Sequence, residues 1–451
     1  MRLRIAVLTG VAFPALLGAQ APRLSVPATV DTLPNGLILI VHEDHSVPRV
    51  ATNIWYRVGS GDEKPGRTGF AHLFEHLMFM GSENAPYPQF DKLSEPFGFS
   101  PNGSTTEDRT NYLQVGGANG LELILWLEAD RMGWLLPTMD SAKVDAQRDI
   151  VKNERRQSYE NQPYGKAADI LPPALYPSGH PYSWPVIGSM ADLSAASLED
   201  VKEFFRRYYA PNNAAIVIAG DVRTDSVRRL VRQYFGDIPR GPTITRPAPA
   251  PFTVKDTAIV TEDRVQLPRL YLGWHTVNNT HQDVAPLNLL SYLLTGARNS
   301  RLTNTLVYGR EIASSVSAFS DAKRLDGDYS IVATARPGQG LDSLKVAIDR
   351  ELERLMTEGP TARELDQAKN ARESSFLNQL EFVSAKADQL NEYAYFNGTP
   401  DYFQKDLDAL RGVTADDIKR VIRTYLRGPR VMLSIVPMGK LELAAKRVIV
   451  Q

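Results

Sequence analysis

The sequence predicts an α+β protein of two homologous domains, each a largely antiparallel sheet packed against helices. Three observations support this fold class. The chain has 451 residues, which is too long for one ordinary hydrophobic core. A proline-rich stretch divides it near the middle, and one helix–turn–strand pattern occurs in both halves.

The division falls between Ile238 and Phe252, where five prolines and a glycine lie close together. This composition favours an extended linker. We therefore expect an N-terminal domain at 25–238, a linker at 239–255 and a C-terminal domain at 256–451.

The repeated pattern joins an amphipathic helix, a turn containing proline and an apolar strand. It occurs at 201–218 and again at 418–436, and one constant offset aligns the two segments. The matched pairs are Lys202 with Lys419, Arg206 with Arg423, and Tyr208 with Tyr425. Coincidence between two ordinary amphipathic helices is the alternative, but the shared order of helix, turn and strand favours duplication of one α/β unit.

The composition is that of a soluble globular protein, with 43% hydrophobic and 23% charged residues. The formal net charge is −1, so no overall field favours nucleic acid or an anionic membrane, and no nucleic-acid partner is expected. Basic pairs such as Arg206-Arg207 lie beside acidic residues on amphipathic helices, which is typical of solvated faces.

The first 21 residues have the order of a secretory signal peptide. Two arginines precede an apolar run, Ile5 to Leu17, and small residues follow, with cleavage expected after Ala19 or Ala21. No later stretch is long and apolar enough to span a membrane. The chain has no cysteine, so no disulfide framework is expected. The mature protein is predicted to be exported, either periplasmic or secreted, without a transmembrane segment.

The segment His72-Leu73-Phe74-Glu75-His76 carries the chemistry. It lies in a predicted helix from about Thr68 to Met80, with Thr68 as its cap and Gly81 at its end. Histidines four residues apart stack on one helix face, where two imidazoles can hold one Zn²⁺ at about 2.0–2.1 Å each. Glu75 then lies near the metal without binding it, where a base for a metal-activated water belongs. The alternative is an ordinary half-buried helix that happens to carry these residues.

A catalytic zinc usually has a third protein ligand and one open position. The helix expected from Ser141 to Glu160 offers Glu154, which shares a face with Ile150 and Gln147. A glutamate amid lysines and arginines is, taken singly, more often solvated than a ligand. The other expected elements are strands at 37–42, 51–58, 104–115, 214–218 and 431–436, and a helix at 121–132.

These residues resemble the pitrilysin/insulinase class of metallopeptidases, in particular its short two-domain bacterial members and the zinc-bearing subunit of mitochondrial processing peptidase. The resemblance covers nearly all of the mature chain and is most specific at 69–81, Gly-Phe-Ala-His-Leu-Phe-Glu-His-Leu-Met-Phe-Met-Gly. It implies a zinc-binding N-terminal peptidase domain and a homologous C-terminal domain without the zinc motif. The implied catalytic base is Glu75, and the implied ligands of one Zn²⁺ are His72, His76 and Glu154.

Further matches to this class are 102–105, 108–112, 179–182 and 209–213. By resemblance, the segment from Asn102 lies on a sheet edge beside the zinc, where a substrate peptide adds as a strand. Asn102, Gly103 and Thr105 are therefore predicted to bind substrate, although Asn102 is equally well explained as a turn former. His180 is predicted to be structural.

The chain departs from this class in two places. Gln147 stands where members often carry a second acidic residue, and its neutral amide would weaken ligand orientation without removing the metal. Val307 and Ser314 stand where the resemblance implies an arginine and a tyrosine that stabilise an oxyanion. Arg301, Tyr308 and Arg310 lie nearby in the sequence and are the candidates that a shifted alignment would offer.

The resulting hypothesis is a zinc endopeptidase that cleaves short or unfolded peptides as the zinc-bearing subunit of a heterodimer. A homologous partner chain would supply the arginine–tyrosine pair in trans. A homodimer or a weakly active monomer is the alternative assembly. Two other functions stay open: a non-catalytic scaffold or peptide-binding protein of the same fold, and a zinc hydrolase of non-peptide substrates.

Overall fold

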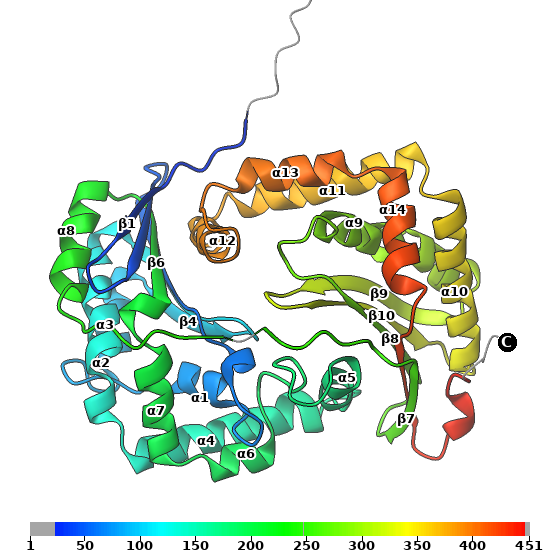
Figure 1. Cartoon of the computed structure of the whole chain (residues 1–451), viewed down its shortest axis with the longest axis horizontal. Helices are drawn as coiled ribbons and strands as arrows, with labels where there is room; N and C mark the ends of the chain where they lie inside the picture. The colour runs from blue at the N-terminus through cyan, green and yellow to red at the C-terminus, as the bar shows by residue number, and fades with distance from the viewer. Residues whose placement is uncertain (1–22, 247, 447–451) are drawn as a thin grey trace, which may run out of the picture.

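The computed structural model describes residues 23–246 and 248–446, which form two halves that each contain one β-sheet (Figure 1). The predicted signal peptide lies outside these residues. Within the described ranges, no helix is both long enough and apolar enough to cross a bilayer.

The N-terminal sheet has six strands in the order β1-β2-β6-β3-β5-β4. Every neighbouring pair is antiparallel except β2 with β6. The central strands β6 and β3 are almost wholly buried, because side chains on both faces of the sheet meet packed layers. The strands are β1 (Thr29–Thr32), β2 (Ile38–Glu43), β3 (Arg49–Tyr56), β4 (Ser100–Thr105), β5 (Thr110–Gly117) and β6 (Ala214–Gly220).

The C-terminal sheet has five strands in the order β7-β11-β8-β10-β9, and only β7 and β11 run parallel. Two mainly antiparallel sheets covered by helices confirm the predicted α+β fold class. The strands are β7 (Thr257–Asp263), β8 (Arg269–Thr276), β9 (Ala313–Ala322), β10 (Gly327–Ala335) and β11 (Val431–Pro437).

Helices cover the outer face of each sheet, and their apolar sides join two large cores, one in each half. In Figure 1, α1, α3, α7 and α8 lie with the N-terminal sheet, and α9, α10 and α14 lie with the C-terminal sheet. The helices are α1 (Phe70–Leu77), α2 (Gln89–Ser94), α3 (Leu121–Trp134), α4 (Ser141–Arg155), α5 (Ala167–Leu175), α6 (Met190–Ala195), α7 (Leu198–Tyr208), α8 (Thr224–Phe235), α9 (Val284–Thr295), α10 (Leu341–Glu358), α11 (Ala362–Gln379), α12 (Val383–Phe396), α13 (Phe403–Gly412) and α14 (Ala415–Val421).

The two halves are structural repeats. The constant offset that aligns the repeated sequence segments also places β6 on β11, β5 on β10, and α7 on α14. The same offset places His72 opposite Leu289, which is buried in α9. The N-terminal copy therefore carries an imidazole where the C-terminal copy carries a core leucine.

The halves exchange one helix each across the space between them. Helix α12 packs on the inner face of the N-terminal sheet, where Leu390 joins a core with Ile40 and Val217. Helix α5 packs on the C-terminal sheet, where Ala167 joins Leu433. Each half therefore covers the other's sheet, which buries apolar surface between them.

The proline-rich segment joins the halves without a helix or strand in its described residues, 239–246 and 248–255. Arg246 fixes it to the N-terminal half through Asp62, with Nε 2.5 Å from Oδ1. The extended form agrees with the expected linker, and the domain boundaries stay predictions.

One predicted strand is wrong. The segment 104–115 is a hairpin of β4 and β5 rather than one strand, because the chain reverses between Thr106 and Arg109. The Thr106 N–H donates to the Arg109 carbonyl at 2.9 Å and closes the turn. This reversal makes β4 the edge strand of the N-terminal sheet.

Candidate metal and catalytic site

Helix α1 presents two histidines because its other face is apolar. Leu73, Phe74 and Leu77 are fully buried, and Phe74 packs against the rings of Phe204 and Tyr209 beside α7. Burial of this face stabilises the helix, which is only eight residues long and would be marginal alone.

The start of α1 differs from the prediction. The helix begins at Phe70, and Gly69 precedes it in the left-handed conformation with φ of 87°. Thr68 does not cap the helix, because its hydroxyl accepts the Ser189 N–H and donates to Asp192. The buried carboxylate of Glu63 accepts the Gly69 and Ala71 N–H groups at 2.9 and 2.8 Å. Burial raises the pKa of Glu63, and these backbone hydrogen bonds oppose part of the shift.

Replacing Glu63 with glutamine is expected to lower the free energy of unfolding by about 1–3 kcal/mol. Glutamine keeps the side-chain shape, but its NH₂ group would face a helix N–H and leave that donor unpaired. Urea unfolding followed by circular dichroism measures the change, with the exposed Glu95→Gln as the matched control. Equal stability in the two variants would contradict the capping role of Glu63.

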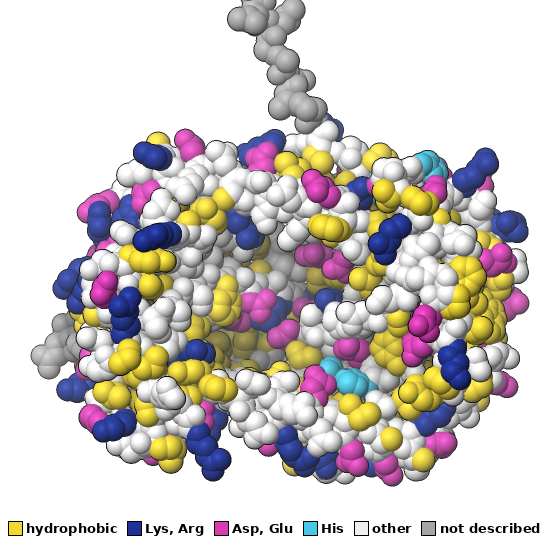
Figure 2. Space-filling model, turned by 180° about the vertical axis from the view of Figure 1, so that it is seen from behind, with side chains coloured by type: hydrophobic (Ala, Val, Ile, Leu, Met, Phe, Trp, Pro, Cys, Tyr) yellow, Lys and Arg dark blue, Asp and Glu magenta, His cyan; other side chains and the backbone are white. Residues whose placement is uncertain are grey.

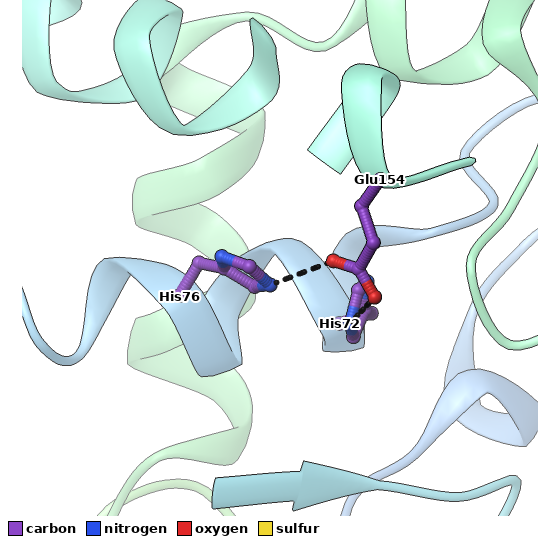
Figure 3. Close-up of side chains that lie close together, drawn as sticks. All are labelled: His72, His76 and Glu154. Carbon is purple, nitrogen blue, oxygen red and sulfur yellow. Dashed lines mark ion pairs between the residues drawn. The ribbon is translucent and has the colours of Figure 1, made fainter. Parts of the chain in front are cut away.

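His72, His76 and Glu154 lie close together, as Figure 3 shows. Glu154 Oε1 is 3.7 Å from His72 Nε2, and its Oε2 is 3.3 Å from His76 Nε2. One ligand atom from each residue lies within 4.8 Å of the others. The side chains are 13%, 24% and 40% exposed for His72, His76 and Glu154, so the cluster opens to solvent on the glutamate side.

Helix α4 brings Glu154 to this cluster from a distant part of the sequence. Asp140 caps the helix by accepting the Lys143 N–H, and Val151 anchors its buried face. The last turn is tied to α5 by Arg155, whose Nη2 lies 2.9 Å from both carboxylate oxygens of Asp169. Glu154 therefore lies at a helix end that the Arg155–Asp169 ion pair holds against α5.

The donor set suits a zinc ion. Two imidazoles and one carboxylate are a common ligand set of catalytic zinc, which leaves one position open. Burial, with a smaller contribution from the charge of His76, lowers the pKa of His72 to about 4, so its ring is neutral near pH 7. A neutral imidazole has the free lone pair that a metal requires.

Glu75 lies beside the cluster but outside its set of ligand atoms. Its Oε2 accepts the Thr105 hydroxyl at 2.6 Å, and this bond comes from the edge strand β4. Burial raises the pKa of Glu75, and the Thr105 hydrogen bond opposes part of that shift. The carboxylate is thus held between the histidine helix and the sheet edge.

The three residues predicted to bind substrate all lie on β4. The Thr106–Arg109 hydrogen bond and the alternation of an antiparallel ladder turn the backbone of Gly103 and Thr105 away from β5. The Asn102 side chain accepts the outward N–H of Gly103 at 2.9 Å. An added Cβ on Gly103 would lie 2.9 Å from Glu75 Cγ, so only glycine allows this close approach.

A cavity of about 450 Å³ lies next to Glu75 and His76. Its wall combines apolar residues with a few polar ones: Phe79, Met80, Tyr87, Asp91, Pro101, Asn102, Gly103 and Gln147. Figure 2 shows that the molecule is also hollowed between its halves, with acidic and basic side chains along the hollow. The volume of the cavity beside Glu75 and His76 lies within the range of ligand pockets.

Gln147 lies in the wall of this cavity, and its Nε2 donates to the Met80 sulfur at 2.8 Å. The resemblance to the pitrilysin/insulinase class predicts that a residue at this position bears on the orientation of the metal ligands. Among the hydrogen bonds of the described residues, Gln147 makes none to His72, His76 or Glu154.

The residues near the missing arginine–tyrosine pair are engaged elsewhere. The Val307 carbonyl accepts from Arg336, and the Ser314 hydroxyl donates to the Thr334 carbonyl. Arg301 is bound to Glu364, with Nε 2.6 Å from Oε1. A shifted alignment to Arg301 thus yields a guanidinium that is already paired.

His180 has a structural place between the halves. Its Nδ1 accepts the Tyr182 N–H, and its Nε2 lies 3.1 Å from Asp326, which also contacts His275. Since Nδ1 accepts, Nε2 is the nitrogen that donates to the carboxylate.

Two helix-covered, mainly antiparallel sheets carry two histidines and a glutamate beside a sheet edge, and this donor set is that of a class of catalytic zinc sites in hydrolases. Residues 39–178 match the insulinase family, peptidase family M16, and residues 195–372 match the peptidase M16 inactive domain. The chain is 31% identical over 406 residues to the zinc protease PqqE of Helicobacter pylori, covering 88% of this chain and 89% of PqqE. The chain belongs to peptidase family M16.

Other relatives agree with this assignment. The chain is 25% identical over 440 residues to the probable mitochondrial-processing peptidase subunit beta of Arabidopsis thaliana, covering 93% of this chain and 80% of that one. The crystal structure of a protease from Helicobacter pylori superimposes with a TM-score of 0.85 at 27% identity, over 92% of this chain and 100% of that chain. The periplasmic protease PqqL of Escherichia coli shares the fold at a TM-score of 0.76 and 18% identity; the match covers 95% of this chain but 49% of PqqL.

Proposed function

We propose that the chain is a zinc-dependent endopeptidase that hydrolyses short or unfolded peptides. The observation that carries this proposal is the convergence of His72, His76 and Glu154 within 4.8 Å, with Glu75 beside them. The proposed ligands of one Zn²⁺ are these two histidines and Glu154. Zinc in such a site lowers the pKa of water and polarises a carbonyl oxygen.

Glu75 is the proposed catalytic base. Its carboxylate is close to the proposed ligands yet free of the metal set, so it can accept a proton from the attacking water and pass it to the leaving amine. Its partly buried position keeps bulk water from competing for that proton.

The edge strand β4 is the proposed substrate platform. The outward backbone groups of Gly103 and Thr105 are suited to pairing with an extended peptide. Such pairing uses the peptide backbone and depends little on the peptide sequence. When a peptide binds, the hydrogen bond from the Gly103 N–H to the Asn102 side chain would break, and the Gly103 N–H would donate to the peptide instead. Backbone pairing favours peptides over non-peptide substrates.

The proposed assembly is a heterodimer in which this chain is the zinc-bearing subunit. Val307 and Ser314 leave no oxyanion pair at the expected positions, and a relative of the chain is named as a subunit. A homologous partner would supply the arginine and tyrosine in trans.

The proposed location is the periplasm or the outside medium. The signal-peptide order of the first 21 residues supports export, and PqqL is named a periplasmic protease. Mass spectrometry of the exported product tests this location. The mature chain is expected to begin just after Ala19 or Ala21, and an exported product that keeps the first 21 residues would contradict cleavage.

The activity is tested by zinc analysis and by cleavage of a quenched peptide library. The chain is assayed alone and with a homologous chain that lacks the zinc motif but carries the arginine–tyrosine pair. About one zinc per chain and cleavage that needs the partner are expected. Full turnover by the chain alone would refute the heterodimer. Bound zinc without cleavage in any mixture would favour the scaffold function, which the match to the M16 inactive domain keeps as the second candidate.

A further inference from the structure

We propose that Thr105 is the residue that positions Glu75, and that its side chain serves the base rather than the substrate. This inference rests on the proposed function of Glu75. It changes the expected role of Thr105, whose backbone alone is left to pair with a peptide.

The Thr105 hydroxyl is held on a rigid hairpin. Thr105 pairs with Thr110 across the ladder, and the Thr110 hydroxyl is itself bound to the Val58 carbonyl at 2.9 Å. On the hairpin's other side, Arg109 donates to the Ser104 carbonyl at 2.8 Å and lies over the Trp55 ring at 5.0 Å. The hydroxyl is therefore fixed by strand pairing and by contacts at the turn.

The hairpin confines the Glu75 carboxylate from two directions. Thr105 Oγ1 donates to Oε2 at 2.6 Å, a length typical of a hydroxyl on a carboxylate. Gly103 lies against the other carboxylate oxygen, since a Cβ built on this glycine would be 3.0 Å from Oε1. Among the hydrogen bonds of the described residues, Thr105 supplies the only one to this carboxylate.

This arrangement divides the two carboxylate oxygens between two tasks. Oε2 is used by Thr105, which leaves Oε1 to accept the proton of the attacking water. Without the hydroxyl, Glu75 keeps its carboxylate but gains rotational freedom around its side-chain bonds. A misoriented base lowers the rate of the chemical step, whereas it has a smaller effect on the affinity for substrate.

The same strand residue then links substrate binding to the base. The backbone of Thr105 faces the open edge of the sheet, while its side chain reaches Glu75. A peptide that pairs with β4 would steady the residue that orients the base. Substrate pairing and base orientation are thus set by one residue.

The test compares Thr105→Val, Thr105→Ser and the control Thr357→Val in the zinc-loaded complex. Valine keeps the shape and removes the donor, and Thr357 undergoes the same exchange at an exposed position on α10, where its hydroxyl donates to the Glu353 carbonyl. We expect Thr105→Val to lower kcat by about 10- to 100-fold with KM within about twofold. Thr105→Ser should restore most of the rate, and Thr357→Val should change it little.

A second readout does not depend on activity. In the metal-free protein, a ¹³C-labelled Glu75 carboxylate, assigned through Glu75→Gln, should shift its NMR signal in Thr105→Val and not in Thr357→Val. Wild-type kcat and an unshifted signal in Thr105→Val would overturn the positioning role. An inactive wild-type complex would instead refute the proposed function, and the carboxylate signal would still decide the contact with Thr105.

Discussion

Replacing Glu75 with glutamine is expected to remove peptide cleavage while about one zinc stays bound per chain. Glu75 lies outside the group of possible ligand atoms formed by His72, His76 and Glu154, so the variant loses the proposed base and no proposed ligand. Loss of a general base lowers kcat by about 10²- to 10⁴-fold. Glutamine has the same shape and its oxygen can still accept the Thr105 hydroxyl, so the fold should be unchanged. Zinc analysis and cleavage of a quenched peptide, both with the partner present, measure the two effects.

The outcome separates three functions. Retained cleavage would remove Glu75 from the chemistry and with it the proposed mechanism. Loss of zinc together with cleavage would make Glu75 a ligand instead of a base. An equal and low rate in native and variant proteins would favour a scaffold, because a scaffold does not depend on this carboxylate.

The fold class was predictable because the strongest signals were local. Proline density located the connection between the halves, and the shared helix–turn–strand order indicated the repeat. The exchange of α5 and α12 was not predictable in the same way. Their apolar faces indicate that each is packed, but the partner sheet lies on the other side of the linker. Periodicity shows that a face is buried without showing what covers it.

The site shows the same limit at the level of single residues. His72 and His76 were linked by helical spacing alone, whereas Glu154 needed the resemblance, since it comes from another helix. Glu63 and the Thr105–Glu75 contact had no sequence signal. Each depends on a tertiary approach, of a loop to a helix start and of a strand to a helix. The hairpin at 106–109 was missed because its turn contains neither glycine nor proline.

Glu154→Gln should lower zinc affinity by more than about 100-fold, the largest effect expected on metal binding. Removal of groups that only support a ligand already costs about 10- to 100-fold in affinity, and here an amide replaces the charged side chain of a proposed ligand itself. The carboxylate oxygens lie 3.3 and 3.7 Å from the two imidazole nitrogens, so the variant loses the negative charge that faces them. Competition with a chelator of known affinity measures the change.

The matched control is Asp149→Asn, which also exchanges a carboxylate for an amide on α4 but at an exposed position outside the cluster. Helix stability and net charge then change alike in the two variants, and only Glu154 faces the histidines. A fall in affinity for Glu154→Gln alone would tie the metal to the junction of α1 and α4. Equal affinity in both variants would remove Glu154 from the site and leave the two histidines without the carboxylate that a catalytic zinc of this type requires.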